Sequence, residues 1–444
     1  MNSKSYDFKK GKGRLFLEKY IINGPTRLTG SVTISGAKNA ALGILPAVLL
    51  TDETCIIENV PDISDVAIML QILTDMGASV RLLDKSTYEI NASGILVSDA
   101  PKDIARKMRA SYYFLGALLG RFSEAKVPMP GGCDLGVRPI DQHIKGFESL
   151  GAKVSIENGG IIEARADKLL GNQIYLDTVS VGATINIILA AVKAEGLTII
   201  ENAAKEPHIV DLANFLNSMG ADIMGAGTDV IKIRGVSYLH GTTYSIIPDQ
   251  IEAGTFMAAA VATRGRILIK NVTPKHLEPI TAKLLKMGVT VEEYDDSILV
   301  SCDGEIGRTN IKTFPHPGFP TDMQPQIAAV LCLANGTSII TEGVWENRFR
   351  YVDELRRMGA NISVDGKVAV IEGIESFHAA PVKATDLRAG AAMIIAALTA
   401  EGTSEIEDIY HIERGYENIT QKFNLLGADI RKISVPEALY EEAL

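Results

Sequence analysis

Residues 181–220, VGATINIILAAVKAEGLTIIENAAKEPHIVDLANFLNSMG, contain the pattern that decides the fold. The first part, residues 181–196, is apolar on nearly every side of a helical wheel and closes with a glycine, which is typical of a fully buried helix. The β-branched run LTIIENAA that follows predicts a strand. The last part places Ile209, Leu212 and Leu216 at the spacing of a half-buried helix. A strand pair after Gly220 completes one unit.

The turn that closes this unit recurs along the whole chain. Each copy ends in Leu or Met followed by glycine, at Gly77, Gly151, Gly220, Gly288, Gly359 and Gly427. These glycines are 68 to 74 residues apart. Such self-similarity at a fixed period indicates repeated supersecondary units with a shared core, so the sequence predicts six repeats of about 70 residues.

The content of each repeat predicts an α/β fold with its helices inside. Strands and amphipathic helices that enclose an apolar helix favour a two-domain, inside-out α/β barrel with three repeats in each domain. We expect the first lobe to span residues 39–246 and the second to combine residues 1–38 with 247–444. The hinge is expected within residues 244–254, and the strand-rich segment 17–35 is expected to close the sheet of the second lobe.

Composition limits the class of protein and the kind of partner. No apolar run approaches the roughly 18 residues of a membrane helix, and residues 1–10 lack the apolar core of a secretory signal, so we expect a cytoplasmic protein. The four cysteines at positions 55, 133, 302 and 332 show no metal-binding spacing. A net charge of −10 disfavours nucleic acid as a partner. An anionic ligand would therefore need local arginine and lysine side chains.

Polar residues stand at the start of each predicted buried helix. Helix N-termini carry free backbone N–H groups and are possible anion sites. Together with nearby arginines, they would line a cleft suited to a substrate with several phosphate or carboxylate groups. The alternative is that Ser, Thr and Asp here are ordinary N-caps, which is the commoner role for each. The entries include Lys38-Asn39, Arg109, Ser180 to Gly182, Asp249 to Glu252, Asp322 and Asp386 to Arg388.

The second repeat is longer than the others between its strand and its closing glycine. The extra residues fall within 127–143, VPMPGGCDLGVRPIDQH, where glycines flank Cys133 and prolines bound the segment. This pattern predicts a surface loop with stiff ends. Arg138 is placed to favour the thiolate of Cys133. A cysteine is more often a small buried hydrophobe, which is the interpretation we adopt for Cys55, Cys302 and Cys332.

Several segments together resemble the UDP-N-acetylglucosamine enolpyruvyl transferase family. The resemblance covers about residues 18 to 432 in order, and the loop cysteine, the TDMQ segment and the RGYE segment are its most specific parts. The matching stretches are GPTRLTGSVTISGAKNAAL, MRASYYFLGALLGRF, PGGCDLGVRPIDQHIKGFESLGA, VSVGAT, ENAAKEP, PHPGFPTDMQPQ, WENRFRYVDELRRMGA, ATDLRAGAA and YHIERGYENI.

The resemblance implies a reaction and a set of site residues. It implies transfer of the enolpyruvyl group from phosphoenolpyruvate to the 3′-hydroxyl of UDP-N-acetylglucosamine, with release of phosphate and with neither metal nor cofactor. Cys133 matches the loop cysteine that the family uses as proton donor and that fosfomycin alkylates, and Asp322 matches the base. The positions that match phosphoenolpyruvate contacts are Lys38, Asn39, Arg138, Arg388 and Arg414. Those that match contacts to the UDP-sugar are Arg109, Arg138, Pro139, Ile140, Asp141, Gln142, Ser180, Val181, Gly182, Asp322 and Val344.

The chemistry needs these groups for physical reasons. Protonation of the methylene carbon of phosphoenolpyruvate creates oxocarbenium character at its neighbour, so an acid and a base must flank it in a site without water. Flanking cations bind the phosphate and support it as it leaves. Three positions depart from the family pattern: Gly43 stands where the family usually has proline, Ser64 stands where some members have lysine, and His208 replaces an acidic residue.

Two alternatives stay open from the sequence. The related enolpyruvyl transferase of the shikimate pathway uses the same chemistry but lacks the loop cysteine. A catalytically silent homologue that binds a UDP-sugar and regulates the pathway is the second, against which the intact Lys38, Cys133, Asp322 and Arg414 argue. The sequence does not determine the oligomeric state.

Overall fold

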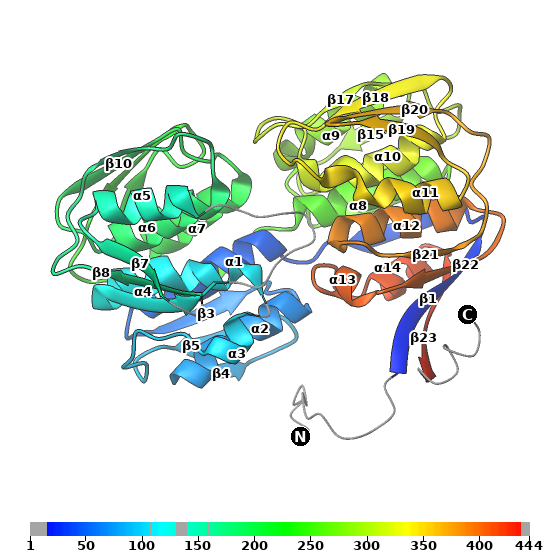
Figure 1. Ribbon diagram of the computed structural model, residues 1–444. Coiled ribbons are helices and arrows are strands. Elements are labelled where there is room, and N and C mark those ends of the chain that lie inside the picture. Colours follow the sequence, from blue (N-terminus) through cyan, green and yellow to red (C-terminus); the bar gives the residue numbers. More distant parts are fainter. Residues whose placement is uncertain (1–15, 107, 130–139, 158–159, 437–444) are drawn as a thin grey trace.

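The computed structural model describes residues 16–106, 108–129, 140–157 and 160–436. Figure 1 shows two lobes, each built from helices enclosed by small sheets. The first lobe has a hydrophobic core formed between Ala37 and Ile246. The second core combines residues from Tyr20 to Ile34 with residues from Ile251 to Ile430. The α/β class with helices inside is therefore confirmed.

Six helices form the centre of the two lobes, one from each repeat. They are buried along nearly their whole length; in the helix at Gln250–Ala262, for example, only the first residue is not buried. Such helices exclude water from all sides, as the all-round apolar sequence predicts. They are α1 Lys38–Ala47, α4 Tyr113–Phe122, α6 Val181–Ala191, α8 Gln250–Ala262, α10 Gln324–Cys332 and α12 Leu387–Thr399.

A second set of helices lies between the strands of each repeat and buries one face. They are α2 Ser64–Met76, α5 Asp141–Ser149, α7 Pro207–Ser218, α9 Pro274–Lys286, α11 Val352–Arg357 and α14 Ile419–Leu425. Shorter helical turns complete the set: η1 Val48–Leu50, α3 Lys102–Ala105, η2 Arg109–Tyr112, η3 Thr321–Met323, η4 Arg348–Tyr351 and α13 Tyr410–Glu413.

The turn after each outer helix needs a left-handed residue. All six repeat glycines have positive φ, between 81° at Gly288 and 112° at Gly77. Only glycine adopts this conformation without a steric penalty, which is why the same residue recurs at the same place. The six-repeat prediction is confirmed at these positions.

Each repeat contributes one small sheet. Five of the six sheets have four strands. Across each of these, an edge strand pairs parallel with its neighbour, and the other two neighbouring pairs are antiparallel. The sheets of the first lobe contain β13 Thr243–Ser245, β3 Thr54–Glu58, β5 Tyr88–Asn91 and β4 Ser79–Leu82; then β6 Glu124–Pro128, β8 Ile161–Arg165 and β7 Lys153–Glu157; then β11 Asp222–Met224, β12 Val230–Arg234, β10 Leu197–Glu201 and β9 Gln173–Tyr175.

The second lobe repeats this arrangement with strands from both ends of the chain. Strand β1 (Phe16–Gly24) lies between β22 (Gly402–Glu407) and β23 (Asp429–Pro436), as Figure 1 shows. Tyr20 is opposite Ile406 on one side and Lys432 on the other. The expected closure of this sheet by the N-terminal segment is confirmed. The other strands are β2 Thr29–Thr33, β14 Arg266–Lys270, β15 Thr290–Glu293, β16 Ser297–Ser301, β17 Ile311–Lys312, β18 Thr337–Thr341, β19 Asn361–Asp365, β20 Val368–Glu372, β21 Pro381–Lys383, β22 Gly402–Glu407 and β23 Asp429–Pro436.

The chain passes between the lobes twice, and the two connecting segments pair with each other. The backbone N–H of Ala37 donates to the carbonyl of Ile247 at 2.7 Å, and the N–H of Asp249 donates to the carbonyl of Ser35 at 2.9 Å. The first connector ends at Lys38, the first residue of α1, while the second ends at Asp249, the cap of α8. Two helix N-termini, one from each lobe, therefore meet where the lobes join.

Candidate active site

At three buried helices the side chain of the cap residue accepts hydrogen bonds from the first turn of the same helix. Ser180 accepts a hydrogen bond from the N–H of Ala183, and Asp249 and Asp386 each accept two from the first turns of α8 and α12. These side-chain oxygens act as N-caps, because they accept hydrogen bonds from otherwise free N–H groups of their own helices. No side-chain cap is present at α1, α4 or α10 within the described residues.

Asp322 lies at the centre of a cationic cluster in the second lobe. Its Oδ2 accepts hydrogen bonds from Nε and Nη2 of Arg388, at 3.2 and 3.0 Å. Nη2 of Arg348 is 3.7 Å from Oδ1 of the same carboxylate and donates to the carbonyl of Thr321 at 3.1 Å. Asp322 belongs to the short turn η3, which leads directly into the buried helix α10.

The two arginines dominate the electrostatics of Asp322. Its recessed position alone would raise the pKa of the carboxyl group, but Arg388 and Arg348 outweigh this effect and hold the pKa well below its usual range. Arg348 and Arg388 are themselves buried, at 2% and 3% exposure. Nη1 of Arg388 and Nε of Arg348 have no hydrogen-bond partner among the described residues. Buried guanidinium donors without partners favour the binding of an additional anion here.

Arg388 is also fixed from its other side. Its guanidinium lies 5.4 Å from the ring centroid of Tyr416, a cation–π contact. The hydroxyl of Tyr416 is 2.9 Å from Oγ1 of Thr255 and accepts a hydrogen bond from Nε2 of Gln326 at 3.2 Å. The buried helices α8 and α10 thus hold, through Tyr416, the arginine at the start of α12.

A second cluster joins the two lobes. Nζ of Lys38 is 2.8 Å from Oδ2 of Asp65, and Nε of Arg414 is 2.9 Å from Oδ1 of the same carboxylate. Lys38 and Asp65 come from α1 and α2 of the first lobe, whereas Arg414 follows α13 of the second. Both cations had been predicted to contact phosphoenolpyruvate, and the structure brings them together. Asp65 was missed from the sequence.

Lys38 connects this cluster with the first one. A Cβ on Gly415 would lie 3.1 Å from Cδ of Lys38, so the backbone of the second lobe touches the lysine stem. The charges of Arg388 and Arg414 lower the pKa of Lys38, and the charge of Lys38 lowers the pKa of Asp322. Four of the predicted residues, Lys38, Asp322, Arg388 and Arg414, therefore form one electrostatic unit between the lobes.

Some of the residues predicted to contact the nucleotide sugar lie around the starts of α5 and α6. Gly182 leaves room for two neighbours, because a Cβ there would be 2.9 Å from Nε2 of His143 and 3.1 Å from the hydroxyl of Tyr112. Asp141 and Gln142 open α5 nearby. Nε2 of Gln142 donates to Oδ2 of Asp141 at 2.9 Å, and its Oε1 accepts from the N–H of Asp177, also at 2.9 Å.

His143 was not predicted from the sequence. It is 5% exposed, and neither ring nitrogen has a hydrogen-bond partner within the described part of the chain. Burial lowers the pKa of its imidazole to about 4, so the ring is neutral near pH 7. Its ring meets that of Tyr112 edge to face at a centroid distance of 5.0 Å. The signal was available, since a histidine at this helical position falls on the buried face of α5.

The remaining predicted residues have less defined surroundings. Asn39 is half-buried beside Lys38, and Ile140 caps α5, while Val181 begins α6 after Ser180. Val344 is 37% exposed, and its N–H donates to Glu342 at 2.9 Å. Arg109 begins η2. Cys133, Arg138 and Pro139 lie outside the described residues. Cys55, Cys302 and Cys332 are buried, as expected.

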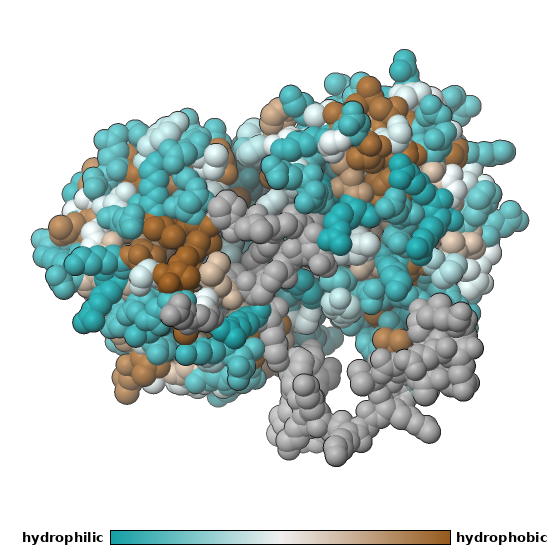
Figure 2. Space-filling model, viewed as in Figure 1, coloured by the Kyte–Doolittle hydropathy of each residue, from teal (hydrophilic) through white to brown (hydrophobic). Residues whose placement is uncertain are grey.

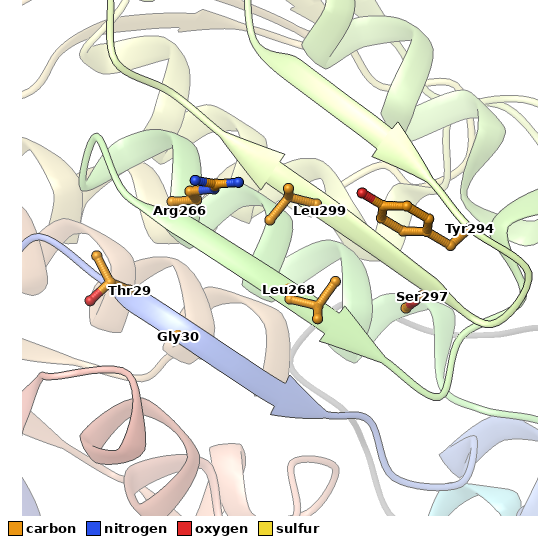
Figure 3. A pocket seen from close by; sticks show the side chains of 7 residues that line it. All are labelled: Thr29, Gly30, Arg266, Leu268, Tyr294, Ser297 and Leu299. Carbon is orange, nitrogen blue, oxygen red and sulfur yellow. The ribbon is translucent and has the colours of Figure 1, made fainter.

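One surface hollow lies away from these residues. It has a volume of about 610 Å³ and lies over the sheet formed by β2, β14 and β16, lined by side chains such as Arg266, Leu268 and Tyr294 (Figure 3). None of its lining residues is a predicted site residue. Figure 2 shows hydrophilic residues over much of both lobes in this view, with separate hydrophobic patches. Among the described residues, no helix has the length and apolar character needed to cross a bilayer, and no cluster of metal-binding side chains occurs.

Known proteins resemble this chain over nearly its whole length. The family model for EPSP synthase (3-phosphoshikimate 1-carboxyvinyltransferase) matches residues 22–423. A protein of Caldanaerobacter subterraneus subsp. tengcongensis named UDP-N-acetylglucosamine 1-carboxyvinyltransferase 3 is 58% identical over 94% of this chain and 100% of its own length. UDP-N-acetylglucosamine 1-carboxyvinyltransferase 2 of Clostridium acetobutylicum is 57% identical over 94% of this chain and 99% of its own length.

Solved structures show the same fold. The enolpyruvyl transferase NikO from Streptomyces tendae has a TM-score of 0.87 at 27% identity, covering 95% of this chain and 100% of its own. An EPSP synthase from Acinetobacter baumannii has a TM-score of 0.73 at 20% identity, covering 94% of this chain and 100% of its own, a similarity of fold alone.

Proposed function

Because this chain belongs to the enolpyruvyl transferase family, we infer that it is a UDP-N-acetylglucosamine 1-carboxyvinyltransferase. It transfers the enolpyruvyl group of phosphoenolpyruvate to the 3′-hydroxyl of UDP-N-acetylglucosamine and releases phosphate, the first committed step of peptidoglycan synthesis. The observation that carries this function is the identity of 58% over the full length of a relative with this name. The shikimate alternative is less supported, because its solved representative is only 20% identical.

The cationic cluster supports a role in binding phosphoenolpyruvate. Lys38 and Arg414 converge on one carboxylate, and Arg388 presents a buried donor without a partner among the described residues. In our proposal these three cations, with Asn39 and Arg138, hold the phosphate and the carboxylate of the substrate. Charge-assisted hydrogen bonds from arginine suit both groups, because the guanidinium fork matches their planar oxygens.

Asp322 is proposed as the base that removes the proton from the sugar hydroxyl. The deprotonated oxygen attacks C2 of phosphoenolpyruvate while a proton is delivered to the methylene carbon. We assign this proton donor to Cys133. Loss of phosphate and of one methyl proton then regenerates the enol double bond. The low pKa of Asp322 keeps it ionised and ready to accept, but it also makes it a weak base while Arg388 is bound.

The nucleotide sugar is proposed to bind along the start of α5 and α6. The residues assigned to it come from both proposed lobes. From the first they are Arg109, Arg138, Pro139, Ile140, Asp141, Gln142, Ser180, Val181 and Gly182, and from the second Asp322 and Val344. The close approach of Gly182 to Tyr112 and His143 packs the start of α6 against the first turn of α5. In this proposal the lobes span residues 39–246 and 1–38 with 247–444, and the protein works in the cytoplasm.

A single assay tests the function. Phosphate release from phosphoenolpyruvate should require UDP-N-acetylglucosamine, and shikimate 3-phosphate should not replace it. Release that depends on shikimate 3-phosphate would establish the related enzyme instead. Binding of the UDP-sugar without any release would identify a silent homologue.

A further inference from the structure

Asp65 contacts two predicted site residues, Lys38 of the first lobe and Arg414 of the second. No other acidic side chain among the described residues forms such a pair of contacts. Oδ2 of Asp65 is 2.8 Å from Nζ of Lys38 and accepts from Nη2 of Arg414 at 3.3 Å, while its Oδ1 accepts from Nε of Arg414 at 2.9 Å. The side chain of Asp65 is 3% exposed, and that of Lys38 is 10% exposed.

Asp65 lies in the first turn of α2, and its burial there is uncommon for a carboxylate. Helix α2 buries Asp65, Met69, Ile72 and Met76 along one face. A charge on such a face is costly unless opposite charges compensate it, because water is excluded. Lys38 and Arg414 supply that compensation, so the three groups form one unit of net charge +1.

We propose that Asp65 is a positioning residue for the binding of phosphoenolpyruvate. Asp65 keeps Lys38 charged and holds Arg414 of the opposite lobe beside it. The inference rests on the proposed function, since it takes both cations as contacts of that substrate. Asp65 itself does not touch the substrate. It acts by fixing two cations at one point, so that an arriving phosphate meets both at once.

The charges around Lys38 explain why it needs this partner. Burial lowers the pKa of the ammonium group, and the neighbouring Arg388 and Arg414 lower it further. The carboxylate of Asp65 opposes these effects most strongly, and Asp322 also interacts with the charge of Lys38. The backbone N–H of Lys38 donates to Asp249 at 3.0 Å. Without the charge of Asp65, Lys38 would lose its proton at a lower pH and would no longer attract a phosphate.

The test compares Asp65→Asn and Asp65→Glu with the matched control Asp211→Asn. Asp211 is also a buried aspartate of the first lobe, but it accepts hydrogen bonds from Tyr244 and Ile247 rather than from a cation. We expect Asp65→Asn to lower kcat/KM for phosphoenolpyruvate roughly 100-fold, the scale of loss when substrate-binding groups are misplaced. The dissociation constant for UDP-N-acetylglucosamine should change by less than about threefold, since Asp65 contacts none of its proposed residues.

The pH profile separates positioning from a merely structural role. In Asp65→Asn the basic limb of kcat/KM for phosphoenolpyruvate should move to lower pH, because Lys38 deprotonates earlier. Asp65→Glu keeps the charge, so its basic limb should stay in place while the rate falls about tenfold from altered geometry. An unchanged basic limb in Asp65→Asn, or an equal loss of UDP-sugar affinity, would overturn the proposal.

Two further measurements cover the remaining outcomes. If Asp65→Asn does not fold, Asp65→Glu decides alone: a shifted basic limb in that variant contradicts the proposal. Titration with inorganic phosphate separates this inference from the proposed function. Even if the native protein releases no phosphate in the transfer assay, its affinity for inorganic phosphate should exceed that of Asp65→Asn by about tenfold or more. Equal affinities would contradict the role of Asp65.

Discussion

The guanidinium of Arg388 donates two hydrogen bonds to a single oxygen of Asp322, from Nε at 3.2 Å and from Nη2 at 3.0 Å. This pairing joins the proposed base to a proposed substrate-binding cation. As long as it persists, Asp322 is stabilised as a carboxylate and has little tendency to take a proton. Binding of the substrate carboxylate by Arg388 would compete with this contact and release the base at the moment it is needed.

Replacing Asp322 should separate binding from turnover. We expect Asp322→Asn to retain UDP-N-acetylglucosamine with an affinity near that of the native protein. Its kcat should fall by about 10² to 10⁴, the usual range for a lost general base. Calorimetry and phosphate release measure the two quantities. The exposed Asp365→Asn serves as a control, and an Asp322→Asn variant with near-native turnover would show that another group is the base.

Replacing Arg388 with lysine should change both affinity and pH dependence. Lysine cannot form the two-fold contact of the guanidinium, so KM for phosphoenolpyruvate should rise about tenfold or more. With a weaker cationic contact, the pKa of Asp322 should rise toward its usual range. The acidic limb of the kcat/KM profile should therefore move to higher pH. A profile that keeps its acidic limb would mean that Asp322 is not the titrating group.

Cys133 is predicted to be the residue that fosfomycin alkylates. The other three cysteines provide internal controls, because each is buried and burial raises the pKa of each thiol, to about 12 for Cys332. A thiol with a raised pKa is a poor nucleophile. Peptide mass spectrometry after incubation with drug and UDP-sugar should find one adduct, on the peptide containing Cys133. No adduct there, or labelling of a buried cysteine, would contradict this assignment.

His143 should reduce stability in acid. Its folded pKa of about 4 lies below the ordinary value of 6.5, so between these values the unfolded chain binds more protons. Stability should consequently fall as pH decreases from about 6.5 to about 4, with a cost that approaches ~3 kcal/mol at the acid end.

The variant His143→Gln should remove this part of the pH dependence. Denaturant unfolding at pH 7 and at pH 4.5 measures it, as the difference between native protein and variant at the two values. His240→Gln, at an exposed histidine, is the control and should leave the difference unchanged. If the variant loses as much stability in acid as the native protein, His143 does not titrate in this way.

A side chain at Gly415 should disturb the site, because this glycine lies against Leu387 and Lys38. A Cβ at this position would be 2.6 Å from Cδ2 of Leu387 and 3.1 Å from Cδ of Lys38. Relief of such overlap typically costs about 1–3 kcal/mol. We expect Gly415→Ala to raise KM for phosphoenolpyruvate by displacing Lys38 or by separating the lobes. Gly304→Ala, whose Cβ would meet no atom within 4 Å, is the matched control, and equal KM values for the two variants would contradict the prediction.

Part of the site could be predicted from the sequence, and the reason is local. Lys38, Asp322 and Arg388 stand at or next to the starts of buried helices, so periodicity indicated their position in the fold, whereas their proposed roles came from the family resemblance. Asp65 also left a signal: it shares the apolar face of α2 with Met69 and Ile72. A carboxylate at such a position requires a buried partner, but the sequence does not reveal which one.

The sequence by itself determined the six repeats, since each depends on a local rule. Glycine adopts the left-handed turn that closes every repeat, and an all-round apolar segment must be buried wherever it occurs. The tertiary structure alone decided which charges meet. Asp65 and Arg414 are separated by 349 residues, and Asp322 and Arg388 by 66. Such contacts depend on how two lobes and several helices pack. The Coulomb energy of two charges depends on their distance in space, which the local pattern of residues does not determine.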